Sequence, residues 1–225
     1  SETVFNISIV PFEYNPTSNE MVVYDEIEII VEETGDREAD EFTPQLRSRT
    51  FEKLYETMIV NYTPSGRDED YQDPAILYIC GGNSESNSYF QQLVDWRHKR
   101  GYVVYTASIS ETGSSSSQVK SYVTNAYNTF SPRPEFVALV GDAGGSYNVP
   151  TFYEDWGHDY YGDWCEGDHP YSQLDGDDLL PEVLVGRISV RSSSHISNVV
   201  NRIINYEKAT YLGSLNNFYE RAAVV

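Results

Sequence analysis

The fold is decided by the stretch from Phe136 to Arg187, which opens with FVALVGD (residues 136–142) and closes with PEVLVGR (residues 181–187). Each end is a short apolar run that stops at a glycine, the pattern of a strand buried inside a parallel sheet. Ligands of such sheets bind beyond the carboxyl ends of the strands. The sequence therefore predicts that Asp142, directly after the first run, lies at the functional edge.

The interval between Arg133 and Arg187 contains no Lys or Arg, whereas carboxylates crowd it. Carboxylates at this density repel one another unless a positive charge lies among them. A hard cation with oxygen ligands, Ca²⁺ before Mg²⁺, would supply that charge, and a solvated acidic surface is the alternative. The acidic residues from the first run onward are Asp142, Glu154, Asp155, Asp159, Asp163, Glu166, Asp168, Asp175, Asp177, Asp178 and Glu182.

Composition narrows the class of protein. The 225 residues carry a formal net charge of -20, which argues against a nucleic-acid partner and against an anionic membrane surface. No apolar run reaches the roughly 18 residues of a transmembrane helix, so we expect no membrane insertion. The acidic, Tyr- and Ser-rich composition suits a secreted or cell-surface protein. The chain begins Ser1-Glu2-Thr3 without Met and enters a strand pattern at once, so we expect an excerpt of a longer precursor.

The first part of the chain predicts a small β-rich unit followed by a helix. Residues 4–10 alternate apolar and polar side chains, and residues 21–31 form a second strand pattern, so the two predict an antiparallel hairpin with its turn at 11–19. A helix is predicted from Pro44 to about Met58. The breaker-rich residues 61–73 predict a linker.

From Pro74 onward, strand and helix patterns alternate. This alternation predicts an α/β domain with a mainly parallel sheet flanked by helices. The strands are expected at 75–80, 102–107, 136–140 and 182–188, the helices at 86–100, 114–130 and 194–208, and a further strand begins at 222–225.

Three segments of this domain resemble the gingipain-type cysteine peptidases: residues 136–142, residues 168–178 (DHPYSQLDGDD) and residues 181–189. The resemblance continues upstream through Trp96 and Gly101-Tyr102 and covers about residues 62–225. It implies a caspase-like fold, with residues 62–225 as the first part of the catalytic domain. By the same resemblance, residues 1–61 are the end of the β-rich propeptide.

The resemblance also implies a function. It implies a secreted zymogen that cleaves protein or peptide substrates with a Cys–His pair. In the family that pair follows the strand that begins at Ala222, so we expect no catalytic residue in this chain. The remaining C-terminal segment of the precursor is the expected partner. Asn61 stands where the arginine-specific members have Arg, which leaves Arg47, Arg49 and Arg67 as other cut sites.

A structural Ca²⁺ is implied as well. The ligands of the family fall on the carboxylates of Asp142, Asp178 and Glu182 and on the backbone oxygens of Asp175 and Leu180. An EF-hand does not explain these residues, because the twelfth position counted from Asp175 is Gly186, where that loop needs Glu.

The sequence also allows three other hypotheses about function. Cys165 with His158 or His169 is the one local Cys–His combination, but all three lie in a Gly- and Tyr-rich loop rather than on a rigid frame. Aromatic residues beside the carboxylates indicate a calcium-dependent carbohydrate-binding or glycosidase module as an alternative. A pseudo-peptidase fragment is the third. These aromatic residues are Trp156, Tyr160, Tyr161 and Trp164.

Overall fold

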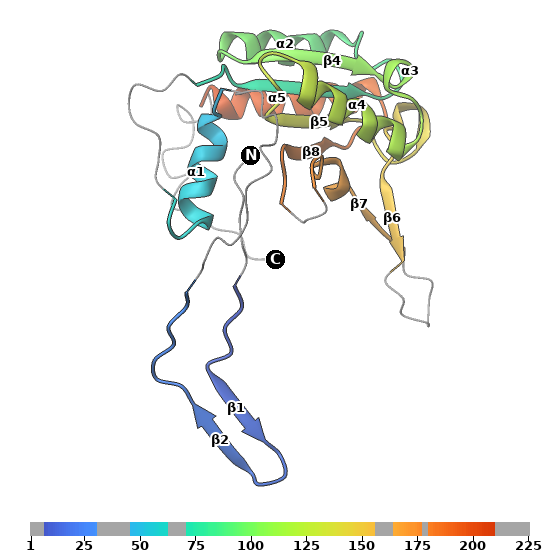
Figure 1. Cartoon of the computed structure of the whole chain (residues 1–225). Coiled ribbons are helices and arrows are strands. Elements are labelled where there is room, and N and C mark those ends of the chain that lie inside the picture. Colours follow the sequence, from blue (N-terminus) through green and yellow to red (C-terminus); the bar gives the residue numbers. More distant parts are fainter. Residues whose placement is uncertain (1–6, 31–45, 63–70, 156–163, 177–179, 210–225) are drawn as a thin grey trace.

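A four-stranded parallel sheet forms the centre of the molecule. The structure is a computed structural model that describes residues 7–30, 46–62, 71–155, 164–176 and 180–209 (Figure 1). The strands run in the order β4-β3-β5-β8, and all three pairings between neighbours are parallel. Their bounds are β3 Ala75–Cys80, β4 Val103–Ser108, β5 Phe136–Val140 and β8 Leu184–Ile188. The predicted sheet is confirmed, and every residue of the central β3 is buried.

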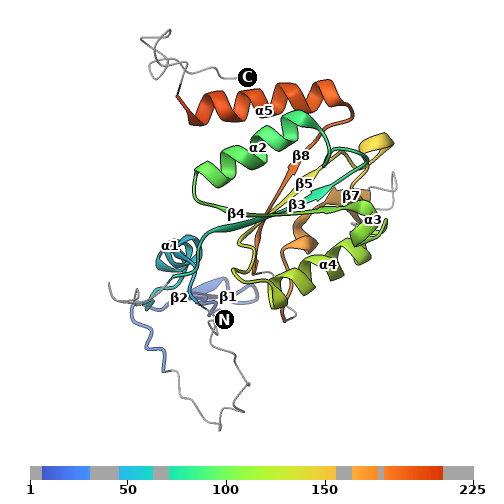
Figure 2. The same ribbon diagram turned by 90° about the horizontal axis from the view of Figure 1, so that it is seen from above.

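Helices cover both faces of the sheet. Figure 2 shows α2 (Ser88–Lys99) and α5 (Ser193–Glu207) on one face and α3 (Ile109–Thr112) and α4 (Ser116–Thr129) on the other. The side chains of β3 alternate between the two resulting cores, with Leu77 and Ile79 in one and Tyr78 and Cys80 in the other. This layering matches the prediction, apart from the short α3, which was not foreseen.

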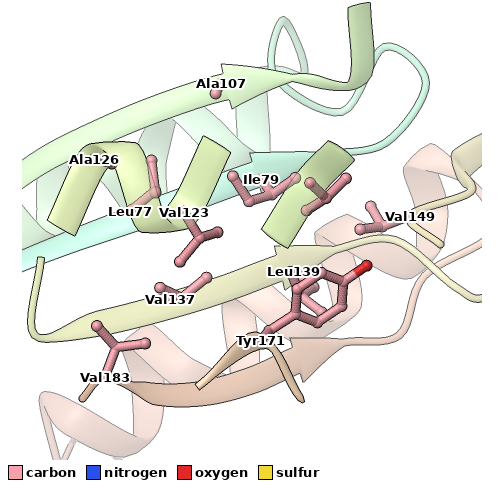
Figure 3. Close-up of a cluster of buried hydrophobic side chains, with 11 residues drawn as sticks. Leu77, Ile79, Ala107, Val123, Ala126, Val137, Leu139, Val149, Tyr171 and Val183 are labelled. Atoms are coloured by element: carbon pink, nitrogen blue, oxygen red, sulfur yellow. The ribbon is translucent and has the colours of Figure 1, made fainter. Parts of the chain in front are cut away.

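The core beneath α4 is built mainly from small aliphatic side chains. Val123 and Ala126 of α4 pack onto Val137 and Leu139 of β5 (Figure 3). Tyr171 closes the same cluster and is fully buried, with its hydroxyl donating to the carbonyl of Pro150 at 2.6 Å. Because that hydroxyl has a partner, the ring contributes apolar burial without an unsatisfied polar group.

The helix ends follow local sequence signals. Ser115 accepts from the backbone N–H of Gln118 and forms a capping box at the start of α4. Arg97, His98 and Lys99 occupy the last turn of α2, where positive charge stabilises the helix dipole. Gly101 then ends the helix with φ +87°, a conformation that glycine adopts without strain.

The connection between β5 and β8 contains elements that the sequence did not reveal. A short 3-10 turn, η1 (Gly145–Tyr147), precedes the antiparallel hairpin of β6 (Phe152–Asp155) and β7 (Trp164–Gly167). A second turn, η2 (His169–Tyr171), carries the buried tyrosine back to the sheet. The segment from 143 to 174 is therefore partly ordered by its own backbone pairing.

The amino-terminal hairpin exists, but its strands are shifted. The structure pairs β1 (Phe12–Asn15) with β2 (Glu20–Val23), so the predicted turn at 11–19 shortens to residues 16–19. Asn19 adopts φ 55°, which places the turn at a residue type that tolerates this conformation. The hairpin projects away from the sheet (Figure 1), and every described residue from 7 to 30 is exposed.

Helix α1 (Arg49–Met58) lies at the end of the sheet where the strands begin (Figures 1 and 2). It begins later than predicted, with Ser48 as the N-cap, while Pro44 lies outside the described residues. The strand predicted at 222–225 also lies outside them, as do residues 63–70 after the predicted domain boundary. Among the helices of the described segments, none is long and apolar enough to cross a membrane.

Candidate functional site

The candidate site is the carboxyl edge of the sheet, where Asp142 follows β5. One carboxylate oxygen of Asp142 accepts from the backbone N–H of Ala143 at 3.0 Å and from the hydroxyl of Ser189 at 3.1 Å. The other forms an ion pair with the guanidinium of Arg191. These donors hold the pKa of Asp142 below its ordinary value, and the hydrogen bond from Arg191 has the largest effect.

A second arginine organises the same edge from within. Arg187 of β8 binds both carboxylate oxygens of Asp168 at 2.7 Å through Nε and Nη2. Its Nη groups also donate to the carbonyls of Gly141, Val149 and Pro150 at 3.1, 2.8 and 3.3 Å. The side chain is only 14% exposed, so these are partly buried, charge-assisted hydrogen bonds.

Thr151 completes this network by donating from its hydroxyl to Asp168 at 2.9 Å. One arginine therefore joins the last strand of the sheet to the loop after β5 and to the residue before η2. Neither Arg187 nor Asp168 was predicted to have a role. An arginine inside an otherwise apolar strand pattern was the available signal, because such a side chain needs a buried partner.

At Asp142 and Asp168, arginine side chains supply the positive charge for which the sequence analysis expected a cation. In the parallel pairing of β5 with β8, Leu139 lies beside Arg187. The residues that follow Leu139, Asp142 among them, therefore lie beside the residues that follow Arg187. Arginines that lie far away in sequence thus supply the charge at both carboxylates.

Asp142 and Glu182, both predicted to bind one Ca²⁺, are not brought together. β5 and β8 are parallel, Asp142 follows β5, and Glu182 precedes β8, so the two carboxylates lie at opposite ends of the strand pair. The five-residue strand between these two levels alone spans roughly 15 Å, and each residue lies beyond its end. Ligands of one ion lie within about 2.6 Å of it, so Asp142 does not belong to a site with Glu182.

The other predicted ligands lie close together in sequence, before β8. Glu182 Oε2 accepts from the backbone N–H groups of Leu174 and Asp175 at 2.6 and 3.2 Å, which holds the Glu182 side chain against these two residues. Asp175 is exposed, Leu180 is 37% exposed, and Asp178 lies outside the described residues. Among the residues that the structure describes, no three His, Cys, Asp or Glu side chains are grouped to hold a metal.

The end of β5 is shaped by close backbone contacts. A Cβ built on Gly141 would lie 2.0 Å from the carbonyl oxygen of Tyr147, and one on Gly81 would lie 2.3 Å from it. Only glycine fits at such distances. The two glycines after β3 and β5 therefore let the loop that contains η1 fold directly over the carboxyl edge.

Of the two cysteines, the structure describes the side chain of Cys80 alone. Cys80 is fully buried, and burial raises the pKa of its thiol to about 12, so it is not a thiolate nucleophile. His169 lies 3.3 Å through Nδ1 from the hydroxyl of Ser172. His158, Trp156, Tyr160 and Tyr161 lie outside the described residues.

The comparisons with known proteins identify the family. The model of peptidase family C25 matches residues 69–222, which is more than half of the chain, so the chain belongs to this family of cysteine peptidases. Gingipain R1 of Porphyromonas gingivalis is 24% identical over 90% of the chain, and Lys-gingipain of the same species is 28% identical over 91%. The chain spans 20% and 12% of these two relatives.

Solved structures agree on the fold. The crystal structure of the Arg-specific cysteine proteinase gingipain R is similar with a TM-score of 0.51 and 22% identity, over 64% of this chain and 30% of that one. The complex of the pro- and mature domains of RgpB from Porphyromonas gingivalis gives a TM-score of 0.51 over 59% and 29%. The caspase-like, mainly parallel α/β architecture that the resemblance implied is thereby confirmed.

Proposed function

We propose that this chain is the amino-proximal part of a secreted, gingipain-like cysteine endopeptidase that cleaves protein or peptide substrates. The membership of residues 69–222 in peptidase family C25 carries the proposal. The Arg187 network supports it, because it gives the carboxyl edge of the sheet the rigid frame that a catalytic group needs. In this proposal the scaffold comes from this chain, and the catalytic Cys and His come from sequence beyond Val225.

The experiment uses the longer polypeptide that continues past Val225. A thiol-reactive peptide probe should label a cysteine outside residues 1–225, and the labelled protein should lose its cleavage of a peptide panel. Cys165→Ser should change neither labelling nor cleavage. Loss of labelling in Cys165→Ser would show a nucleophile inside this chain and would overturn the proposed division.

The organisation as a zymogen is part of the same proposal. Residues 1–61 would be the end of a propeptide, and residues 62–225 the first part of the catalytic domain. The similarity to a complex of pro- and mature domains supports this division. Amino-terminal sequencing of the processed enzyme would locate the cut. A mature protein that retains the β1–β2 hairpin would contradict the proposal.

We also propose a structural Ca²⁺ held by the segment from 174 to 182, with Asp175, Asp178, Leu180 and Glu182 as ligands and without Asp142. Carboxylate and carbonyl oxygens are the ligands that Ca²⁺ takes. An ion that binds only the folded chain stabilises it by about 2.7 kcal/mol at a hundred times its Kd. We therefore expect excess EDTA to lower the melting temperature by roughly 5–10 °C.

Two matched substitutions test whether Ca²⁺ binds near Glu182 or at Asp142, on the carboxyl edge of the sheet. In Glu182→Gln, Ca²⁺ should no longer raise the melting temperature, whereas in Asp142→Asn the rise should equal that of the unsubstituted chain. A rise that disappears in Asp142→Asn but persists in Glu182→Gln would reverse the assignment. An unchanged midpoint in EDTA, with no metal in the purified protein, would remove the site altogether.

A further inference from the structure

Glu135, at the amino end of β5, is a buried carboxylate held by neutral donors. Its side chain is 2% exposed. Oε2 accepts from the hydroxyl of Thr50 at 2.9 Å, and Oε1 accepts from the side-chain amide of Gln72 at 3.1 Å. The same amide nitrogen of Gln72 donates to the carbonyl of Arg133 at 2.9 Å, which fixes its orientation. Thr50 comes from α1, whereas Gln72 and Glu135 belong to the part matched by the family.

The first turn of α1 packs against this end of the sheet. Ser48, Phe51 and Glu52 are each less than 9% exposed. Glu52 accepts from the hydroxyl of Tyr71, and the ring of Tyr71 also lies 4.7 Å from the guanidinium of Arg49. The backbone N–H of Gln72 donates to the carbonyl of Arg47 at 3.0 Å. The contact therefore combines backbone pairing, a cation–π contact and two carboxylates that accept from hydroxyls.

Beyond Glu52, α1 is largely exposed, with Leu54 and Tyr55 half-buried. Lys53, Glu56, Thr57 and Met58 are exposed, so the helix contacts the sheet mainly through its beginning. A desolvated carboxylate is costly unless donors surround it. Among the described residues, Thr50 supplies one of the two side-chain donors to Glu135, so removing α1 leaves half of this arrangement.

We propose that Glu135 and Gln72 form a docking site for the first turn of α1, which holds residues 46–62 to the family domain after the chain is cut within residues 63–70. The partner that fits this site is the amino-terminal turn of a helix whose second residue carries a hydroxyl. In α1 the N-cap is Ser48 and the second helical residue is Thr50. The proposal deepens the zymogen organisation proposed above. It rests on that organisation for its biological meaning, although the association itself requires no peptidase activity.

The test introduces a specific protease site within residues 63–70 of the full chain and cuts the folded protein. The two pieces should co-elute in gel filtration under native conditions. In Thr50→Val they should separate, because losing a hydrogen bond to a charged acceptor weakens association roughly 10- to 100-fold. Thr50→Ser keeps the hydroxyl and should behave as the unsubstituted chain does.

Thr57→Val is the matched control, because its hydroxyl donates only within α1, to the carbonyl of Lys53 at 3.0 Å. Its pieces should remain together. A peptide of residues 46–62, added in excess, should displace the cut piece, and the same peptide with Thr50→Val should not. These peptides leave the fold of the domain untouched, so the readout does not depend on the stability of a variant.

Separation of the unsubstituted pieces would overturn the proposal, as would equal displacement by the two peptides. A longer precursor without thiol-dependent cleavage would contradict the proposed enzyme activity but would leave this docking site standing. The two hypotheses therefore fail in different experiments.

Discussion

Arg187 compensates negative charge in the acidic stretch after Arg133, where more than fifty residues in a row contain no Lys or Arg. It pairs with Asp168 and satisfies carbonyls of the loop after β5, although it comes from the last strand of the described sheet. Arg191 performs a simpler task on Asp142, because its side chain is 73% exposed. The two arginines differ in burial, and their contributions to stability should differ accordingly.

We therefore expect Arg187→Met to lower the free energy of unfolding by about 3–5 kcal/mol, since Asp168 would remain partly buried without its partner. Arg191→Met should cost no more than about 1 kcal/mol, because exposed pairs contribute little. Urea denaturation with an unchanged m-value would measure both. Equal losses in the two variants would contradict this ranking.

The strands could be predicted because their signals are local. The apolar run Ala75–Cys80 between breakers needs no knowledge of the remaining chain, and the parallel order follows from the alternation with helices. The hairpin of β6 and β7 was missed because FYED and WCEG show neither clear alternation nor a short turn between them. Asp142 was grouped with the other expected Ca²⁺ ligands through the family resemblance, whereas the parallel pairing of β5 with β8 places it at the other edge of the sheet from Glu182.

The signal that separates Asp142 from Glu182 was nevertheless in the sequence. A residue after one strand and a residue before the next parallel strand must lie at opposite edges of a sheet. The partners of Asp142 and Asp168 could not be predicted in this way. These partners depend on which strand lies beside β5, and packing across the whole sheet determines the order of the strands.

At the scale of elements, the loop that contains η1 depends on glycines at the strand ends. Gly141→Ala should destabilise the fold by about 1–3 kcal/mol, because the new methyl group would meet the carbonyl oxygen of Tyr147. Gly186→Ala is the control, since a Cβ at that position in β8 has no neighbour within 4 Å. Removing a glycine from a strand should stabilise the fold by up to about 1 kcal/mol.

Thermal and urea denaturation of both variants would test this difference in sign. If both alanines stabilise the chain, the close packing of the loop on β5 is not present in solution.

Helices α2 and α5 are joined near their carboxyl ends by Glu207. It accepts from the indole N–H of Trp96 and from Arg97, both at 2.7 Å. Burial opposes the ionised form, but the hydrogen bonds from Arg97 and Trp96 prevail and hold the pKa of Glu207 below its ordinary value of 4.5. A depressed folded-state pKa contributes stability that is present above the unfolded-state pKa and is lost as the pH falls through the folded-state pKa.

The free energy of unfolding should therefore fall between about pH 5 and pH 3, and Glu207→Gln should flatten part of this fall. Unfolding titrations at several pH values would measure the difference between the two chains. Parallel curves for Glu207→Gln and the unsubstituted chain would show that Glu207 does not contribute to the pH dependence.

At the scale of the whole molecule, stability is unevenly distributed. β3 and β5 are paired on both sides and covered by helices, whereas residues 7–30 are exposed throughout. Amide hydrogens of residues 7–30 should exchange within seconds, and those of β3 should exchange only on global unfolding. Deleting residues 11–24 should leave the melting temperature of the sheet unchanged. Slow exchange in β1 and β2 would show that a further contact covers the hairpin in solution.

The Arg187 network also has a consequence for how the protein is made. A ribosome adds roughly 5–20 residues each second, so Arg187 leaves it several seconds after the loop that follows β5. During that interval the carbonyls of Gly141, Val149 and Pro150 lack the guanidinium that they later bind. The carboxyl edge thus takes its final form only once β8 has emerged. A nascent chain that stalls before this strand exposes the incomplete carboxyl edge of the sheet, where chaperones can bind.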